Sequence, residues 1–364
     1  MRVLFAGGGT GGHLYPGLAI ARALVRIAPR AEPFFIGARR GIERDELPGS
    51  GFPFVLLDLH PLYRARPWEN WRTVRGVASA WRGVSAVARE SAPAALVATG
   101  GYAAGVALAW AVAHAVPIAI QEQNSYPGLT VRLFARWARE IYLGFPEAGG
   151  LLSRGSATLL DTGNPIEPPP SPRPGRATAR QRWGFPQQGG RVLLVFGGSQ
   201  GARAINAVVG AWLDQGLPPD LYLIWGTGKR SYDDFARYES ERVRVRPYLT
   251  PMAEAYAATD LAIARAGAMG TAEMCAWGIP SILVPLPTAA ADHQTVNART
   301  LVAAGAALML AEEELSAGRL DAMVKELMTD PERLSALSLR ASARGRPDSA
   351  EIIANRIVAM GMMK

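Results

Sequence analysis

The fold class is decided by FAGGGTGGH, residues 5–13, a glycine-rich turn between an apolar run and a helical pattern. The apolar run, Arg2–Ala6, predicts a strand, and Tyr15–Ile27 predicts a helix. The same succession returns at FGGSQGAR, residues 196–203. Each half of the chain therefore opens with a strand, a turn and a helix, which indicates an α/β fold.

Short β-rich runs alternate with longer helical patterns on both sides of these turns. Strands are expected at Arg2–Ala6, Pro33–Ile36, Ala95–Thr99, Pro117–Ile120, Glu140–Leu143, Arg191–Phe196, Leu221–Trp225, Val243–Arg246, Leu261–Ala264, Ser281–Val284 and Ala307–Leu310. Helices are expected between them, one of them beginning at Thr250-Pro251, and Ser349–Met360 predicts a last amphipathic helix. Strands that alternate with helices imply parallel sheets covered on both faces.

Length and one proline-rich segment divide the chain. Its 364 residues exceed the usual size of a single hydrophobic core. The segment GNPIEPPPSPRPG, residues 163–175, can continue neither a helix nor a central strand. We expect a first domain at 1–162, this linker, a second domain at 176–345 and a C-terminal helix at 346–364 that packs back on the first domain. Two doubly wound domains would bind ligands at the carboxyl ends of their strands, in a cleft between the domains.

The composition describes a folded protein with anionic partners. The net charge is +8 and most basic residues are arginine, which favours a nucleotide, a nucleic acid or an anionic membrane, unless it reflects a genome-wide arginine bias. Cys275 is the single cysteine, so no intrachain disulfide can form, which suits a reducing compartment. The most apolar stretch, Ala103–Ile120, is interrupted by His114 and Pro117 and predicts a buried helix followed by a strand. We expect a soluble or peripheral protein.

The first glycine-rich turn has the spacing of a dinucleotide loop, because Gly7, Gly9 and Gly12 fit G-x-G-x-x-G. That fingerprint requires an acidic residue at the end of the second strand, where this chain has Arg39. The absence of the acid weakens an NAD site, although an arginine leaves NADP open. A second glycine-rich turn in the other half is difficult to explain for an enzyme with one dinucleotide.

Three further polar clusters follow predicted strands. After Leu261–Ala264, glycines expose backbone N–H groups at a helix start, and Arg265 could offset phosphate charge. Glu273 could accept hydrogen bonds from ribose hydroxyls or simply complement the helix dipole. The other clusters are Asp292 with Gln294 and Asn297, which share a helix face, and the run Gln121–Asn124 with the neighbouring Gly100–Tyr102.

These segments together resemble one family. GGGTGGH, TGGY, EQN…PGLT, GNP, GGSQGAR…N, RAGA…E and DHQ…N occur in the order and approximate spacing of the MurG family of glycosyltransferases, from residue 2 to about residue 305. The resemblance implies the GT-B fold, two Rossmann-like domains with the active site in the cleft between them. It implies inverting transfer of GlcNAc from UDP-GlcNAc to the 4-hydroxyl of MurNAc in lipid I, forming lipid II. Peptidoglycan synthesis, cell-wall biogenesis, cell shape and cell division follow from that role.

The resemblance also implies two sets of binding residues and no cofactor. The donor set is Ser199, Gln200, Gly201, Arg265, Ala268, Glu273, Gln294 and Asn297; the acceptor and diphosphate set is Thr10, Gly11, Gly12, Tyr102 and Asn124. Two positions depart from the family pattern: Gln121 stands where a histidine is common, and Glu167 and prolines stand where an arginine often follows Gly-Asn-Pro.

Inverting transfer needs a base for the acceptor hydroxyl and stabilisation of the departing diphosphate. His13 is the first candidate for the base, because an imidazole titrates near neutral pH, and Glu122 is the second. A helix cap or a phosphate contact is the alternative role of His13. Helix N-termini and Arg265 could stabilise the leaving group without a metal, and we expect no metal site.

A membrane face is expected near residues 64–88. Basic and aromatic residues crowd there, namely Arg64, Arg66, Trp68, Trp71, Arg72, Arg75, Trp81 and Arg82, beside a predicted helical stripe of Val74, Val77, Trp81, Val84 and Ala88. This combination is typical of a helix lying on an anionic bilayer, although RNA stacking or a core helix with an arginine fringe would look similar. The expected partners are UDP-GlcNAc, lipid I and the cytoplasmic face of the membrane, bound peripherally, with no nucleic acid.

Three rivals stay open at this point: another GT-B lipid glycosyltransferase, such as a UDP-sugar:diacylglycerol enzyme, a non-catalytic nucleotide- or lipid-binding subunit, and an NADP-dependent oxidoreductase. The second glycine-rich turn and Glu273 argue against the oxidoreductase. Binding of UDP-GlcNAc but not NADP would separate it from the others.

Overall fold

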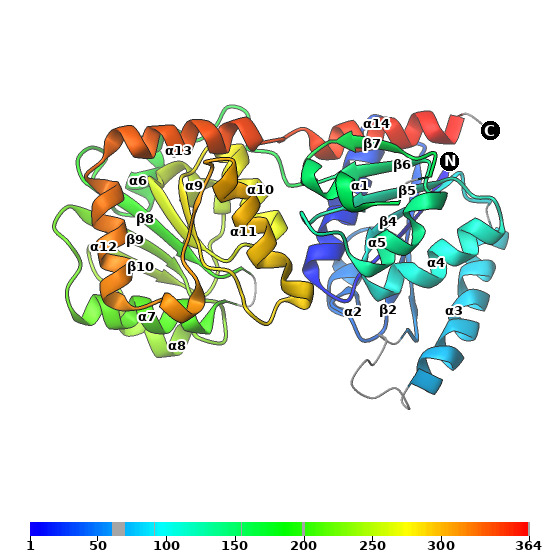
Figure 1. Cartoon of the computed structure of the whole chain (residues 1–364), viewed down its shortest axis with the longest axis horizontal. Coiled ribbons are helices and arrows are strands. Elements are labelled where there is room, and N and C mark those ends of the chain that lie inside the picture. The colour runs from blue at the N-terminus through cyan, green and yellow to red at the C-terminus, as the bar shows by residue number, and fades with distance from the viewer. Residues whose placement is uncertain (60–69, 91, 154, 199–200, 363–364) are drawn as a thin grey trace. The chain divides into compact units, whose positions relative to one another are not determined.

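The computed structural model describes residues 1–59, 70–90, 92–153, 155–198 and 201–362. The chain divides into two compact units, one of Met1–Glu167 with Pro347–Lys364 and one of Pro168–Arg346. Each unit builds its own parallel sheet with helices packed on it (Figure 1). The predicted α/β class with two Rossmann-like domains is confirmed.

Within the described residues, the first unit contains a seven-stranded parallel sheet in the order β3-β2-β1-β4-β5-β6-β7. Its strands are β1 (Arg2–Gly7), β2 (Glu32–Ala38), β3 (Phe54–Leu57), β4 (Ala95–Gly100), β5 (Ile118–Glu122), β6 (Glu140–Leu143) and β7 (Thr158–Asp161). The sequence pattern predicts the five central strands and misses the edge strands β3 and β7. Both are edge strands, and most of their residues are only partly buried.

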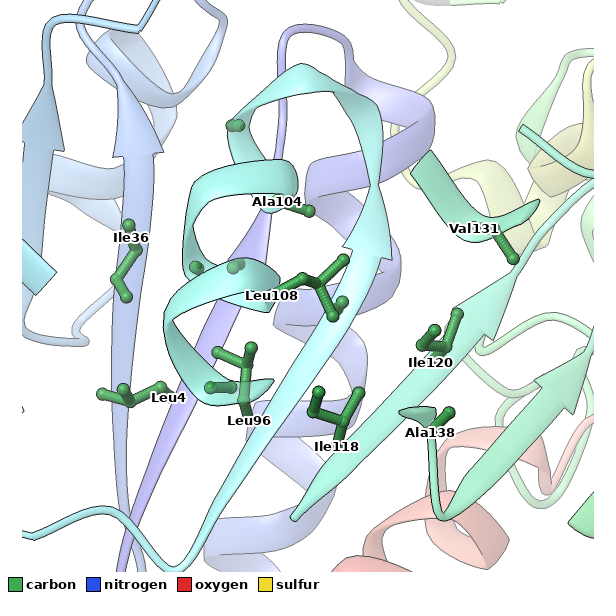
Figure 2. Packing of buried hydrophobic residues seen from close by; sticks show 14 of the residues in the cluster. Leu4, Ile36, Leu96, Ala104, Leu108, Ile118, Ile120, Val131 and Ala138 are labelled. Carbon is green, nitrogen blue, oxygen red and sulfur yellow. The ribbon is translucent and has the colours of Figure 1, made fainter. Parts of the chain in front are cut away.

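Two layers of helices cover this sheet. The helices are α1 (Gly11–Ile27), α2 (Glu43–Glu46), α3 (Asn70–Glu90), α4 (Gly101–Ala113), α5 (Leu129–Phe134) and α14 (Ser349–Met362). Alternate residues of β1 face opposite layers, because Leu4 packs with α3 and α4, whereas Phe5 packs with α1 and α14. Figure 2 shows Leu4 in the first of these layers with Leu96 and with Leu108 of α4.

The C-terminal helix α14 belongs to the first unit. Its buried residues Ile353 and Ile357 join the same core cluster as Leu18 of α1. Arg356 forms an ion pair with Glu140 of β6, and its Nε lies 3.0 Å from a carboxylate oxygen of that residue. Helix α14 is thereby held against α1 and β6.

Within the described residues, the second unit contains a six-stranded parallel sheet in the order β10-β9-β8-β11-β12-β13. Its strands are β8 (Arg191–Phe196), β9 (Leu221–Gly226), β10 (Val243–Arg246), β11 (Leu261–Ala264), β12 (Ser281–Leu283) and β13 (Leu308–Met309). Its helices are α6 (Arg176–Arg182), α7 (Arg203–Asp214), α8 (Tyr232–Phe235), α9 (Met252–Ala258), α10 (Ala268–Trp277), α11 (His293–Ala303), α12 (Ala317–Met328) and α13 (Pro331–Arg344). The helix expected from Thr250-Pro251 begins one residue later, with Pro251 as its N-cap.

Both glycine-rich turns follow a strand at which the strand order reverses. In the first unit β1 lies between β2 and β4, and in the second β8 lies between β9 and β11. Such a switch point leaves a crevice at the carboxyl ends of the strands, where ligands bind in open α/β sheets. The topology therefore places each turn where a binding site is expected.

Candidate functional site

The loop after β1 is shaped by close contacts that only glycine allows. Gly9 has φ 91°, and a Cβ there would lie 2.8 Å from the ring of Tyr102. Gly101 has φ 76°, and a Cβ there would lie 2.1 Å from the carbonyl oxygen of Gly8. The start of α4 therefore presses against the loop, and the ring of Tyr102 covers Gly9.

Helix α1 begins at Gly11, not at Tyr15 as the sequence pattern suggests, so Gly11 and His13 belong to its first turn. The hydroxyl of Thr10 lies 3.1 Å from Nδ1 of His13. The hydroxyl of Thr99, in β4, donates a 2.6 Å hydrogen bond to the carbonyl oxygen of His13. These contacts bring Thr10, His13 and Tyr102 together at one edge of the first sheet.

Glu122, at the end of β5, is 2% exposed and is bonded to the loop that follows it. Its Oε1 accepts from the backbone N–H of Asn124 at 2.9 Å, and its Oε2 accepts from that of Gly128 at 2.8 Å. Burial raises the pKa of Glu122, against the opposing effect of these hydrogen bonds. The carboxylate thus fixes the loop and places Asn124 beside the sheet edge.

Gln121, the position where the family commonly has histidine, is fully buried. Its amide donates a 3.0 Å hydrogen bond to Oδ1 of Asn164, while the Gln123 amide donates to the carbonyl oxygen of Thr99 at 2.8 Å. The side chains of this polar run join β4, β5 and the segment after β7. Gln121 is therefore part of the framework beneath the site.

Sequence reasoning missed Glu43 of α2, whose side chain is fully buried. Its Oε1 accepts from the backbone N–H of Gly9 at 2.9 Å and from that of Ala38 at 3.2 Å. A Cβ at Gly8 or Gly41 would lie less than 2 Å from the carboxylate, so these glycines make room for it. Gly41, beside Glu43 in the sequence, is the one signal that could have revealed it.

In the second unit the described part of the glycine-rich turn is also tightly packed. Gly201 has φ 75°, and a Cβ there would lie 2.3 Å from the carbonyl oxygen of Thr227. Asn206, one turn into α7, donates to the same carbonyl at 2.8 Å and accepts from the indole of Trp225 at 3.0 Å. The predicted residues Ser199 and Gln200 lie outside the described residues.

Helix α10 begins at Ala268, with Gly267 as its N-cap. Glu273 lies in the second turn of this helix, and its Oε2 accepts a 2.7 Å hydrogen bond from the hydroxyl of Tyr256. A helix dipole acts mainly on charges in the first turn, so the position of Glu273 does not favour a role as its counter-charge.

Arg265, directly after β11, is held from several sides. Its guanidinium donates to the carbonyl oxygens of Val284 at 3.2 Å and Pro285 at 3.1 Å and pairs with Glu312. Glu312 already opposes the charge of Arg265. Arg265 therefore holds the loop that follows β12.

The two predicted amides of α11 reach the same loops. Oε1 of Gln294 accepts from the backbone N–H of Leu286 at 3.0 Å. Asn297 is fully buried, and its amide donates to the carbonyl oxygen of Ala266 at 3.2 Å. The structure thus brings Arg265, Gln294 and Asn297 together around the loops that follow β11 and β12.

The predicted stripe of the helix at residues 70–90 is wrong in part. Val84 is buried in the core, whereas Val77 is 41% exposed, because the buried face of α3 runs through Ala80, Val84 and Val87. Trp81 packs against His114 at a ring distance of 6.0 Å. Arg82 is exposed and Ala88 is half-buried. The remaining residues of the predicted face, or their side chains, lie outside the described residues, namely Arg64, Arg66, Trp68, Trp71, Arg72, Val74 and Arg75.

Among the described residues, no three histidine, cysteine, aspartate or glutamate side chains gather as metal ligands. No helix in that part of the chain is both long and apolar enough to span a bilayer.

Comparisons with known proteins cover both units. The Glycosyltransferase family 28 N-terminal domain matches residues 3–143, and the Glycosyltransferase family 28 C-terminal domain matches residues 192–353. The UDP-N-acetylglucosamine--N-acetylmuramyl-(pentapeptide) pyrophosphoryl-undecaprenol N-acetylglucosamine transferase of Moorella thermoacetica is 40% identical, over 97% of this chain and 97% of its own length. The protein of the same name from Salinibacter ruber is also 40% identical, over 98% of this chain and 96% of its own length.

Solved structures show the same architecture. The crystal structure of Acinetobacter baumannii MurG is similar with a TM-score of 0.77 and 24% identity, over 98% of this chain and 99% of that one. A UDP-N-acetylglucosamine 2-epimerase is similar with a TM-score of 0.65 and 12% identity, over 100% of this chain and 97% of that one. Since a transferase and an epimerase share this architecture, the fold alone does not decide the reaction.

Proposed function

This chain belongs to glycosyltransferase family 28, and on that premise we propose that it transfers GlcNAc from UDP-GlcNAc to the 4-hydroxyl of MurNAc in lipid I, forming lipid II. The observation that carries this function is the 40% identity to transferases of that name along nearly the whole length of both chains. The enzyme is a hexosyltransferase of peptidoglycan synthesis, and its product serves cell-wall biogenesis, cell shape and cell division.

We propose that the edge of the second sheet binds the donor. The N-terminus of α10 at Ala268 offers backbone N–H groups to a diphosphate, and Ser199, Gln200 and Gly201 would complete that cradle. Glu273 would accept hydrogen bonds from the ribose hydroxyls. Arg265, Gln294 and Asn297 support this role by ordering the loops after β11 and β12.

The edge of the first sheet would bind the acceptor. We place Thr10, Gly11 and Gly12 at the acceptor diphosphate, because they open α1, and Tyr102 and Asn124 beside them. The acceptor oxygen attacks the anomeric carbon, the bond from that carbon to the UDP oxygen breaks, and the hydroxyl proton passes to a base.

His13 fits the base better than Glu122. Both oxygens of Glu122 accept backbone N–H groups of its own loop. Nδ1 of His13 lies beside the Thr10 hydroxyl, and a tautomer that donates from Nδ1 to that oxygen leaves the lone pair on Nε2. That is the form in which a histidine accepts a proton.

A transfer assay tests the function. The wild type should convert a lipid I analogue with UDP-GlcNAc, and Glu273→Ala should raise the donor KM about 100-fold, because hydrogen bonds to a carboxylate stabilise by about 1.5–3 kcal/mol each. Transfer to diacylglycerol in place of lipid I would favour the other lipid glycosyltransferase, and UDP-GlcNAc binding without turnover would favour the non-catalytic subunit. Unchanged donor KM in Glu273→Ala would refute the ribose assignment alone.

We also propose that the first unit lies on the cytoplasmic face of the membrane, where a lipid-linked acceptor is presented. An exposed apolar row supports this: Leu129 is 40%, Leu133 56% and Trp137 47% exposed, at four-residue spacing along α5 and the turn after it. The exposed Arg132 and Arg136 flank the row, which suits an anionic bilayer.

Vesicle binding tests this placement. The wild type should sediment with vesicles that contain phosphatidylglycerol, less so as salt rises, and Leu133→Ser should weaken binding several-fold. Leu339→Ser, at a leucine that is 71% exposed on α13 of the second unit, is the matched control and should not. Equal weakening by both variants, or no binding by the wild type at any salt concentration, would contradict the placement.

A further inference from the structure

We propose that Tyr256 is a positioning residue that orients the Glu273 carboxylate for the ribose of the uridine diphosphate donor. This inference rests on the proposed function, because it takes Glu273 as the ribose contact. Tyr256 belongs to α9, outside the segments in which the sequence pattern placed candidate site residues.

Tyr256 is packed between two aromatic rings and is 4% exposed. Its ring meets Phe196 edge-on at a centroid distance of 6.3 Å and Trp277 at 5.8 Å. Phe196 ends β8 immediately before the glycine-rich turn, and Trp277 ends α10, the helix that carries Glu273. The hydroxyl is thus fixed relative to both parts of the donor edge.

The hydroxyl donates to Oε2 of Glu273 at 2.7 Å, an ordinary length for a hydrogen bond between two oxygens. A hydrogen bond to one oxygen restricts rotation of the carboxylate and so sets the direction of its other lone pairs. Burial raises the pKa of Tyr256 well above its ordinary value, so the hydroxyl keeps its proton and remains a donor at all physiological pH values. Glu273 therefore meets its ligand already oriented.

Packing alone does not account for the hydroxyl. A phenylalanine would fill the same space between Phe196 and Trp277, and a buried hydroxyl costs free energy unless it is hydrogen-bonded. The polar atom of Tyr256 is directed at the one carboxylate of α10. Its contribution should therefore appear in the binding of a ligand that uses that carboxylate.

The test compares Tyr256→Phe with the wild type on UDP-GlcNAc and on the 2′-deoxyribose analogue of that donor. We expect a rise in the UDP-GlcNAc KM of roughly tenfold with kcat changed less than about twofold, and a clearly smaller rise for the deoxy donor. Tyr222→Phe, at a ring that packs against Phe185 in the same unit, is the matched control and should change neither KM.

Two outcomes would overturn the proposal: an equal loss with both donors, which marks a general structural defect, or no loss with either. In a Glu273→Ala background, Tyr256→Phe should add nothing, because the two residues act as one unit. Full additivity there would also overturn it. Failure of the ribose assignment itself is distinguished by Glu273→Ala, which would then leave the donor KM unchanged.

Discussion

The edges of the two sheets hold their carboxylates in different ways. In the first unit Glu43 and Glu122 are buried and accept backbone N–H groups of the loops beside them. In the second unit Glu273 is partly exposed and accepts from a phenol hydroxyl. A carboxylate that binds its own backbone shapes a loop, whereas one oriented by a side chain can present itself to a ligand.

The comparison also separates the roles of the edges in catalysis. At the sheet edge of the first unit, His13 lies beside a glycine loop that side chains from α2 and α4 contact. At the sheet edge of the second unit, two amides and Arg265 contact the loops after β11 and β12. If the first edge supplies the base and the second only binds, substitutions on the two edges should affect different kinetic constants.

The largest expected effect is that of His13→Ala. Removing a general base should lower kcat by about 10²–10⁴-fold while the donor KM stays within about twofold. Steady-state transfer with saturating lipid I analogue measures both. A change in donor KM with kcat intact would contradict this division of roles between the two units, because it would place His13 in the donor site.

Glu43→Ala should mainly affect stability. The backbone N–H groups of Gly9 and Ala38 would lose their buried acceptor, and we expect a loss of about 3 kcal/mol in the free energy of unfolding of the first unit. Denaturant unfolding measures it, with Glu46→Ala, at an exposed position of the same helix, as the control. A loss no larger than that of the control would show that Glu43 does not brace the loop.

The fold could be predicted from the sequence because the central strands are apolar runs and because a glycine-rich turn follows β1 and β8. The edge strands β3 and β7, most of whose residues are only partly buried, were not predicted. On α3 the expected stripe failed because Val84 belongs to two neighbouring helical stripes, and only packing decides which one is buried.

Some residues of the candidate site could likewise be predicted from the sequence, and others could not. Glu273 and Gln294 follow predicted strands and could be found locally. Glu43 has only a weak local signal, the glycine two residues before it, because it bonds Gly9 from 34 residues away and lies in a short charged stretch, Glu43–Glu46, that is typical of a surface. Tyr256 likewise meets Glu273 only through tertiary packing.

The smallest effect we expect is a pH dependence at Glu122. Its pKa in the folded protein lies above the ordinary value of 4.5 because burial outweighs the hydrogen bonds it accepts. Between pH 4.5 and the raised pKa, the folded state therefore binds more protons than the unfolded state. The contribution of Glu122 to the free energy of unfolding is complete below pH 4.5 and is lost as the pH rises through the raised pKa.

Glu122→Gln has no such titration, so the stability advantage of the wild type over this variant should shrink as pH rises from about 4.5 towards 7, by on the order of 1 kcal/mol. Denaturant unfolding across that range measures the difference, and Glu46→Gln controls for the loss of one exposed charge. An advantage that grew with pH would mean that the N–H groups of Asn124 and Gly128 outweigh burial. The pKa of Glu122 would then lie below its ordinary value, and the carboxylate would be held more firmly than its burial implies, which would sharpen the contrast with Glu273.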